Sequence, residues 1–286
     1  LIASGTSTKT ISLNASTCNF SGSFGVSFSG SNLTFNAGTS QINLTGVNPA
    51  FGGLSQTFYN VSFTSSALTT PSITGANTFN NLTFAARAAS GTGSVALGAD
   101  QTITSLFSVQ SGETNPTRRL LINSNVAGTQ RTITSASNTI FGADFQDIVG
   151  AGAASWDDSS RTNYWGDCKG NSGITFATGR AVYWNLAGTQ NWSATGWAAT
   201  STGTPNEQYF PLAQDTATFT DGGSVTGTIT TNQKNNIGSI DMSGRTSAMT
   251  LSVTATTQIY GNWTNGSGTT LSGTAALTFS GRNTQT

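Results

Sequence analysis

Histidine is absent from this chain of 286 residues, and only 8% of the residues are charged. The 11 basic and 11 acidic side chains balance to a formal net charge of zero. A neutral chain without a basic patch does not attract nucleic acid or anionic lipid, so we expect no nucleic-acid partner. Without histidine and with two cysteines, Ser–His–Asp triads and the usual zinc sites are excluded as well.

Cysteine and long apolar runs are also scarce. Cys18 and Cys168 lie 168 − 18 = 150 positions apart, which matches no zinc or redox motif. We favour two unconnected buried thiols, and a single disulfide is the alternative. No apolar run reaches the roughly 18 residues that cross a bilayer, so we expect no membrane insertion. Because the chain begins with Leu1 rather than Met, we expect a segment of a longer polypeptide.

Helix-forming residues are rare, whereas strand and turn residues are abundant. Thr, Val, Ile and Phe favour strands, and Gly and Asn favour turns. No stretch has the i, i+3, i+4, i+7 apolar spacing of a helix. With 35% hydrophobic residues, including 16 Phe and 6 Trp, the chain has enough apolar side chains to fold. The composition predicts an all-β protein.

Short segments in which polar and apolar residues alternate recur about every ten residues. Each has the period of two that is typical of a half-buried strand. Such regular spacing predicts a fold made only of sheets. The clearest segments are 10–15, 24–28, 33–35, 42–44, 61–63, 82–84 and 95–97.

One segment repeats after 79 − 58 = 21 residues: TFYNVSF at 57–63 matches TFNNLTF at 78–84. A period near 20 residues is typical of one coil of a β-solenoid, in which equivalent residues stack. We expect the repeated Asn60 and Asn81 to lie at corners and to bind the backbone. The repeat predicts a parallel β-helix-like solenoid, and an array of β-sandwiches is the second choice.

A longer correspondence suggests tandem modules. Residues 10–17 resemble 250–257, residues 19–21 resemble 262–264, and residues 33–35 resemble 277–279, at offsets of 240, 243 and 244. Together with the composition, these matches predict a β-repeat module over 1–140, a Trp-rich capping or junction segment over 141–212, and the start of a second β-repeat module over 213–286.

The junction segment contains five of the six tryptophans. Exposed aromatic rings can stack on sugars, so a glycan-binding surface is one interpretation. Terminal coils of a solenoid also need capping, so a joint that buries these rings is the interpretation that we favour. The five residues are Trp156, Trp165, Trp184, Trp192 and Trp197.

The same segment is rich in aspartate. Asp144, Asp147, Asp157 and Asp158 could offer oxygen ligands to a structural calcium ion, although no known calcium-binding spacing is present. Solvated turns are the simpler interpretation, and we expect no other cofactor. Glycan-cleaving enzymes need paired carboxylates at defined separations, and most of the remaining acidic residues are isolated in the sequence. We therefore expect no enzyme.

The repeat Phe-x-Asn-Val/Leu-Ser/Thr-Phe resembles the strand-turn repeats of bacteriophage tail-fibre and other virion structural proteins and of bacterial surface adhesins. The stretch from Phe145 through Trp156 and Trp165 to Phe176 is similar to the ends of their modules.

This resemblance implies an extracellular, structural or adhesive segment of a fibre. A phage tail fibre or other virion surface fibre is the first choice, a bacterial cell-surface adhesin or filament is the alternative, and a glycan-binding or glycan-cleaving tailspike module is a third. It also implies a homo-oligomer, such as a trimer, with other virion or surface proteins and a cell-surface glycan as further partners. No catalytic residue follows from it.

Overall fold

A computed structural model describes residues 1–110, 115–222 and 227–286. The chain winds into a β-solenoid of about 12 stacked coils, with 47% of the residues in strands, so the predicted fold class is confirmed. The described residues contain no α-helix, and a single 3-10 turn, η1, covers Glu207–Tyr209. No helix in these parts of the chain is long and apolar enough to span a membrane.

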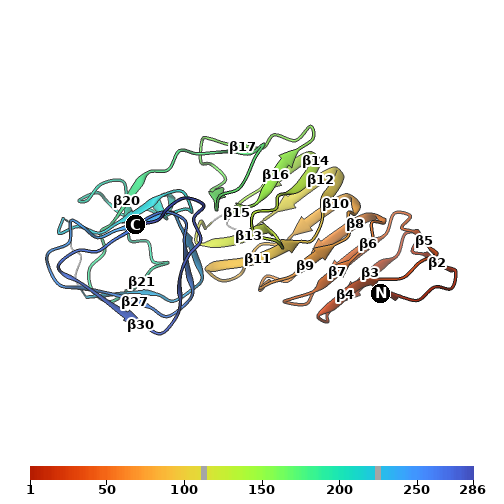
Figure 1. Cartoon of the computed structure of the whole chain (residues 1–286), viewed down its shortest axis with the longest axis horizontal. Coiled ribbons are helices and arrows are strands. Elements are labelled where there is room, and N and C mark those ends of the chain that lie inside the picture. The colour runs from red at the N-terminus through yellow and green to blue at the C-terminus, as the bar shows by residue number, and fades with distance from the viewer. Residues whose placement is uncertain (111–114, 223–226) are drawn as a thin grey trace.

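The coils form two stacks, and the first is built on two long parallel sheets (Figure 1). The eight-stranded sheet contains β1 (Ile2–Ala3), β4 (Phe24–Phe28), β7 (Ala50–Gly52), β9 (Ser72–Thr74), β11 (Gly91–Leu97), β13 (Arg118–Ser124), β15 (Ala143–Gln146) and β18 (Gly166–Asp167). The seven-stranded sheet contains β3 (Thr17–Phe20), β6 (Gln41–Leu44), β8 (Thr57–Phe63), β10 (Thr78–Phe84), β12 (Gln101–Val109), β14 (Arg131–Ile140) and β16 (Ile148–Ala151). Two short pairs add β2 (Lys9–Ser12) with β5 (Leu33–Asn36), and β17 (Asp157–Asp158) with β19 (Thr175–Phe176).

The second stack has three sheets. The first contains β20 (Ala181–Trp184), β22 (Trp197–Ala198), β23 (Thr216–Thr218), β26 (Ser239–Asp241) and β29 (Trp263–Thr264). The second contains β21 (Gln190–Asn191), β24 (Thr228–Thr231), β27 (Met249–Val253) and β30 (Thr269–Gly273), and the third contains β25 (Asn235–Ile237), β28 (Thr257–Ile259) and β31 (Leu277–Phe279). Among all the described strand pairs, only β20–β22 is antiparallel. A β-sandwich array is therefore not formed.

The two stacks point in different directions. In Figure 1 the coils of the first stack are seen from the side, whereas those of the second are seen nearly end-on and outline a ring. The change falls between β19 and β20, that is, between Phe176 and Ala181. The Trp-rich segment 141–212 thus contains the end of the first stack and the start of the second.

The 21-residue repeat pairs in register, which explains why it recurs. Phe79 lies beside Phe58, and Phe84 beside Phe63. All four rings are buried, with ring centroids 5.7 Å apart in the first pair and 4.8 Å in the second. Equivalent side chains stack because parallel strands place them about 4.8 Å apart. The ladder of aromatic residues therefore continues from coil to coil through the core.

The repeated asparagines form a second ladder outside the core. Asn81 Nδ2 donates to Asn60 Oδ1 at 2.9 Å, and Asn81 Oδ1 accepts from the backbone N–H of Leu106 at 3.0 Å. In both strands the alternation of buried and half-buried residues breaks at the repeated asparagine, which lies within the strand. The predicted backbone hydrogen bond is thus present for Asn81, whereas Asn60 accepts from its neighbour in the next coil.

Candidate functional site at the joint between the two stacks

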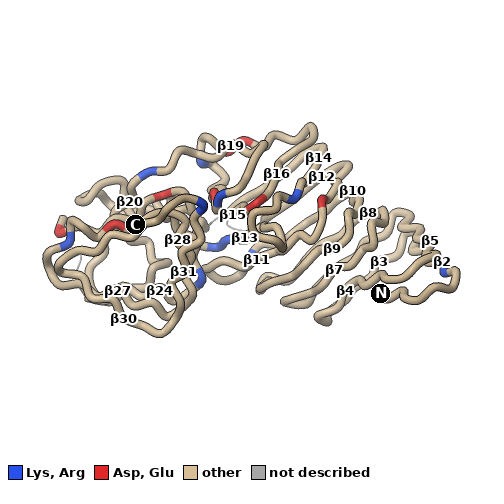
Figure 2. Tube along the Cα trace, viewed as in Figure 1, with Lys and Arg blue, Asp and Glu red and all other residues tan. Residues whose placement is uncertain are grey.

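Charged residues gather where the two stacks meet. Residues 10–86, in the first half of the first stack, contain no charged side chain. Figure 2 shows the contrast between these coils and the region around β13, β15 and the second stack. Each stack has its own apolar core, and a small third cluster of Leu121, Cys168, Ala213 and Tyr260 lies between them. We define the joint as the set of contacts that connect these two stacks.

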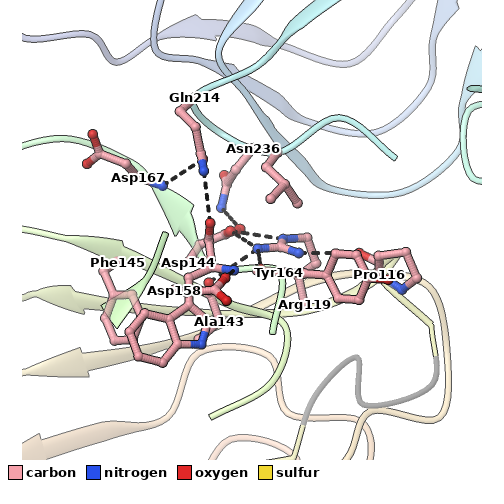
Figure 3. A network of polar contacts seen from close by, with 12 residues as sticks. Pro116, Arg119, Ala143, Asp144, Phe145, Asp158, Tyr164, Asp167, Gln214 and Asn236 are labelled. Atoms are coloured by element: carbon pink, nitrogen blue, oxygen red, sulfur yellow. Dashed lines mark hydrogen bonds and ion pairs between the residues drawn. The ribbon is translucent and has the colours of Figure 1, made fainter. Parts of the chain in front are cut away.

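A buried ion pair of the first stack lies at the joint (Figure 3). Arg119 is on β13 and Asp144 on β15, and their side chains are only 2% and 0% exposed. Arg119 Nε donates to Asp144 Oδ1 at 2.9 Å, and its Nη2 donates to the Tyr164 carbonyl at 2.7 Å. Because parallel strands bring Leu121 beside Asp144, the basic and acidic side chains lie on neighbouring coils.

The second stack binds the same carboxylate. Asn236 Nδ2, on β25, donates to Asp144 Oδ2 at 2.8 Å. A buried carboxylate is costly unless its oxygens are paired, and Asp144 is paired with one group from each stack. Its position therefore fixes how the first coils of the second stack sit against β15.

Another ion pair crosses from the first stack to the second. Arg161, in the chain that leads to β18, donates through Nη1 to Asp215 Oδ2 at 2.7 Å and through Nη2 to Oδ1 at 2.9 Å. Asp215 directly precedes β23 of the second stack and is fully buried. The pairing is bidentate, which is the strongest geometry between guanidinium and carboxylate.

Polar side chains add further bridges. Gln214 accepts from the Asp167 backbone N–H at 3.0 Å and donates to the Trp165 carbonyl at 3.0 Å. Arg282, near the last strand, forms an ion pair with Asp147, which also accepts from the Gly128 N–H at 2.9 Å. These bonds connect segments up to 135 residues apart.

Two glycines leave room for the carboxylates. A Cβ atom at Gly166 would lie 2.0 Å from Asp144 Oδ1, and one at Gly170 would lie 2.0 Å from Asp147 Oδ1. Gly170 also has a φ of +74°, which strains any other residue. The joint therefore depends on small residues as well as on charged ones.

A thiol and a phenol are buried together in the third cluster. Burial raises the pKa of the Cys168 thiol well above its ordinary value, and the nearby Asp144 carboxylate adds to this. Burial is also the main reason why the pKa of Tyr260 is raised. Both groups therefore stay neutral at physiological pH. Cys168 and Cys18 are free thiols, so the alternative of a disulfide is not realised.

The five tryptophans of the sequence prediction are buried, so they offer no surface for a sugar. Trp156 and Trp165 belong to the first core, and Trp184, Trp192 and Trp197 to the second, with exposed fractions of 0–6%. Stacking on a pyranose needs an open ring face, which none of these rings has. The predicted glycan-binding role of this set is wrong, because the rings pack where one core ends and the other begins.

The four aspartates of the predicted calcium site do not form one. Asp144 and Asp147 are each bound by an arginine, Asp158 accepts from the backbone of Asn163 and Trp165, and Asp157 accepts from the Ser159 N–H. Among the described residues, no three Asp, Glu, Cys or His side chains lie together as a metal site would require. Each carboxylate stabilises a turn or the joint.

The residues that build the joint were mostly missed by sequence reasoning. Arg119, Arg161 and Asn236 belong to no recognisable motif, and Asp215 is isolated from other acidic residues in the sequence. The one available signal was the concentration of charge after residue 86. The partners are 25 to 135 residues apart, and no spacing rule connects them. The joint thus fixes the orientation of the two stacks, and its charged groups act in pairs.

Comparison of this chain with protein-family models, curated proteins and solved structures found no match.

Proposed function

We propose that this chain is a segment of an extracellular structural or adhesive fibre. A phage tail fibre or other virion surface fibre is the first choice, and a bacterial cell-surface adhesin is the alternative. The observation that carries the proposal is the stack of parallel coils with unpaired strand edges at both ends. Each further coil would lengthen such a rod by about 4.8 Å without any change of fold.

Both ends of the rod expose apolar residues beside these edges. At the first coil, Ile2 and Phe24 are 72% and 74% exposed, and at the last coil, Leu271 and Phe279 are 49% and 52% exposed. Open edges with exposed apolar residues favour pairing with another chain or module. They support a fibre in which further repeats, or copies of the chain, cover these ends.

One of the three sequence matches at about 240 residues falls on corresponding strands. Residues 10–17 lie in β2 and at the start of β3, and residues 250–257 lie in β27 and at the start of β28. In both places the segment connects two successive faces of one coil. The third match does not keep this correspondence, because β5 (Leu33–Asn36) stacks on β2, whereas β31 (Leu277–Phe279) stacks on β28 rather than on β27. The tandem array therefore stays a prediction that rests on the sequence.

The surface of the first stack suits exposure to a changing medium. Side-chain ladders of neutral residues run up its outside, such as Asn43 to Asn19 at 2.8 Å and Thr70 to Asn48 at 3.0 Å. Neutral ladders do not depend on pH or salt, unlike surface ion pairs. We propose an architectural role without catalysis, with further copies of the chain, other virion or surface proteins and a cell-surface glycan as partners.

Electron microscopy of the native source material, with an antibody against residues 1–140, tests this function. Label spaced along thin fibres that project from virions is the expected result. Label along filaments on cell envelopes would instead support the bacterial adhesin. Label confined to the cell interior, with none on any filament, would overturn both.

A further inference from the structure

An open cavity of about 520 Å³ lies beside the joint, on the side of Arg161 and η1. Its wall is made of hydroxyl and amide side chains, among them Ser159, Thr162 and Gln208, together with the guanidinium groups of Arg161 and Arg180. This volume is within the range of small-molecule sites. The wall offers many hydrogen-bonding groups and positive charge.

The cavity holds two guanidinium groups but one neighbouring carboxylate that can neutralise them. Asp215 accepts four hydrogen bonds: two from Arg161, one from the backbone N–H of Arg180 at 3.0 Å and one from that of Leu212 at 2.9 Å. Four bonds fill the capacity of a carboxylate. The side chain of Arg180 therefore forms no ion pair within the described residues, although the charge of Asp215 is close enough to act on it.

Arg180 is nevertheless held in place. One of its terminal nitrogens donates to the Gln208 carbonyl, and its guanidinium lies 4.7 Å from the ring centroid of Tyr209. A cation over an aromatic face is stabilised and oriented by that ring. Burial, together with the charge of Arg161, lowers the pKa of Arg180, so its charged form would gain from an added anion. Such a preorganised guanidinium suits a planar carboxylate.

We propose that this cavity binds an acidic sugar, with Arg180 pairing with its carboxylate and the hydroxyl-rich wall binding its hydroxyl groups. A sugar acid carries one charge and several hydroxyl groups, and the cavity offers one unpaired cation among Ser, Thr and Gln side chains. A phosphate group carries more charge and gains from several free cations. The inference deepens the proposed adhesive function, on which it rests, because it assigns a receptor class.

Saturation-transfer NMR of the full chain with sodium glucuronate tests the proposal. Glucose is the neutral probe, and inorganic phosphate and acetate are the simple anions. Arg180→Gln is expected to weaken glucuronate binding about ten- to hundredfold, since it removes one charge-assisted pair. Arg131→Gln is the matched control, because Arg131 also has no ion pair among the described residues and lies on β14.

Three outcomes would overturn the proposal: unchanged binding in Arg180→Gln, equal binding of glucose, or binding of phosphate and acetate as tight as that of glucuronate. Thermal melting and circular dichroism show whether Arg180→Gln is folded, and Thr162→Val offers a second, milder variant that is expected to weaken binding severalfold. Antibody label along fibres without glucuronate binding would sink this inference alone. Glucuronate binding without label on any filament would sink the proposed fibre instead.

Discussion

A single side chain in a solenoid acts on the coils directly above and below it. Phe58 and Phe79 illustrate this, because each ring contacts its equivalent in the next coil as well as Phe51 from the opposite sheet. Removing one ring leaves a gap in a ladder that the surrounding backbone cannot close, since its spacing is fixed by hydrogen bonds. The cost of a core substitution is therefore shared between neighbouring coils.

Phe79→Ala is expected to lower the free energy of unfolding by about 3–5 kcal/mol. Phe79→Asp is expected to unfold its coil, because the variant buries a charge without a partner. Phe24→Ala is the control, since the Phe24 side chain is 74% exposed. Urea unfolding and limited proteolysis measure both effects. If Phe79→Asp resists heat and protease as the native chain does, the core ladder is wrongly assigned.

The buried pair in the joint makes a second prediction at this scale. Asp144→Asn leaves Arg119 buried without a counter-ion, so we expect a loss of about 3–5 kcal/mol in the free energy of unfolding. Replacing both residues, as in Arg119→Met with Asp144→Leu, should cost less than Asp144→Asn alone. Lys169→Gln, which breaks a partly exposed pair with Asp167, should cost about 0–1 kcal/mol. A double variant less stable than Asp144→Asn would contradict this account.

Asp221 makes a prediction about pH. The side-chain hydroxyl of Thr246, then the backbone N–H groups of Ser247 and Thr246, with Arg245, lower its pKa from 3.8 to about 2. Since the folded-state pKa is depressed, the stabilisation is complete above about pH 4 and disappears as the pH falls through about 2. Asp221→Asn should therefore lower the urea midpoint at pH 7 and change it little at the lowest pH. An equal effect at both pH values would exclude this hydrogen-bonded carboxylate as the cause.

At the scale of elements, the part of the fold that could be predicted from the sequence is the part that repeats. Strands β8 and β10 carry the same residues because they stack in register, so a comparison of the sequence with itself revealed both the strands and their pairing. Alternation of polar and apolar residues identified β2, β4 and β6 in the same way. Equivalent positions in successive coils have the same physical environment, so they carry similar residues, and this repetition is visible in a single sequence.

The joint could not be predicted because it occurs once. Arg119 and Asp144 are brought together by coil stacking, and Arg161 and Asp215 by the meeting of two stacks, so neither pair has a periodic signal. The tryptophans show the same limit of prediction from sequence. Their number indicated a special segment, but whether a ring faces a core or solvent depends on the direction in which the second stack starts, and composition does not contain that direction.

At the scale of the whole molecule, the joint decides whether the two stacks behave as one body. Stacked repeats are stabilised mainly by their nearest neighbours, so two stacks with separate cores unfold together only if the contacts between them are strong. Here these contacts include two ion pairs with buried carboxylates, Arg161–Asp215 and Arg282–Asp147, and the cluster around Cys168. We therefore expect a single unfolding transition in the native chain, with the bend between the stacks kept until it unfolds.

Asp215→Asn should separate the two stacks. It removes the charge that pairs with Arg161 and weakens the attachment of β23, while the apolar cores remain intact. In a Cys18→Ser background, Cys168 is the one remaining thiol, and its burial in the joint protects it from labelling. We expect calorimetry of Asp215→Asn to show two unfolding transitions. At temperatures below the first transition, we expect the Cys168 thiol to be labelled faster than in the native chain. Asp241→Asn is the control, because this carboxylate binds Ser243 within its own turn. A single transition with native labelling rates in Asp215→Asn would mean that the apolar contacts alone hold the bend. The charged residues of the joint would then orient the stacks rather than hold them together.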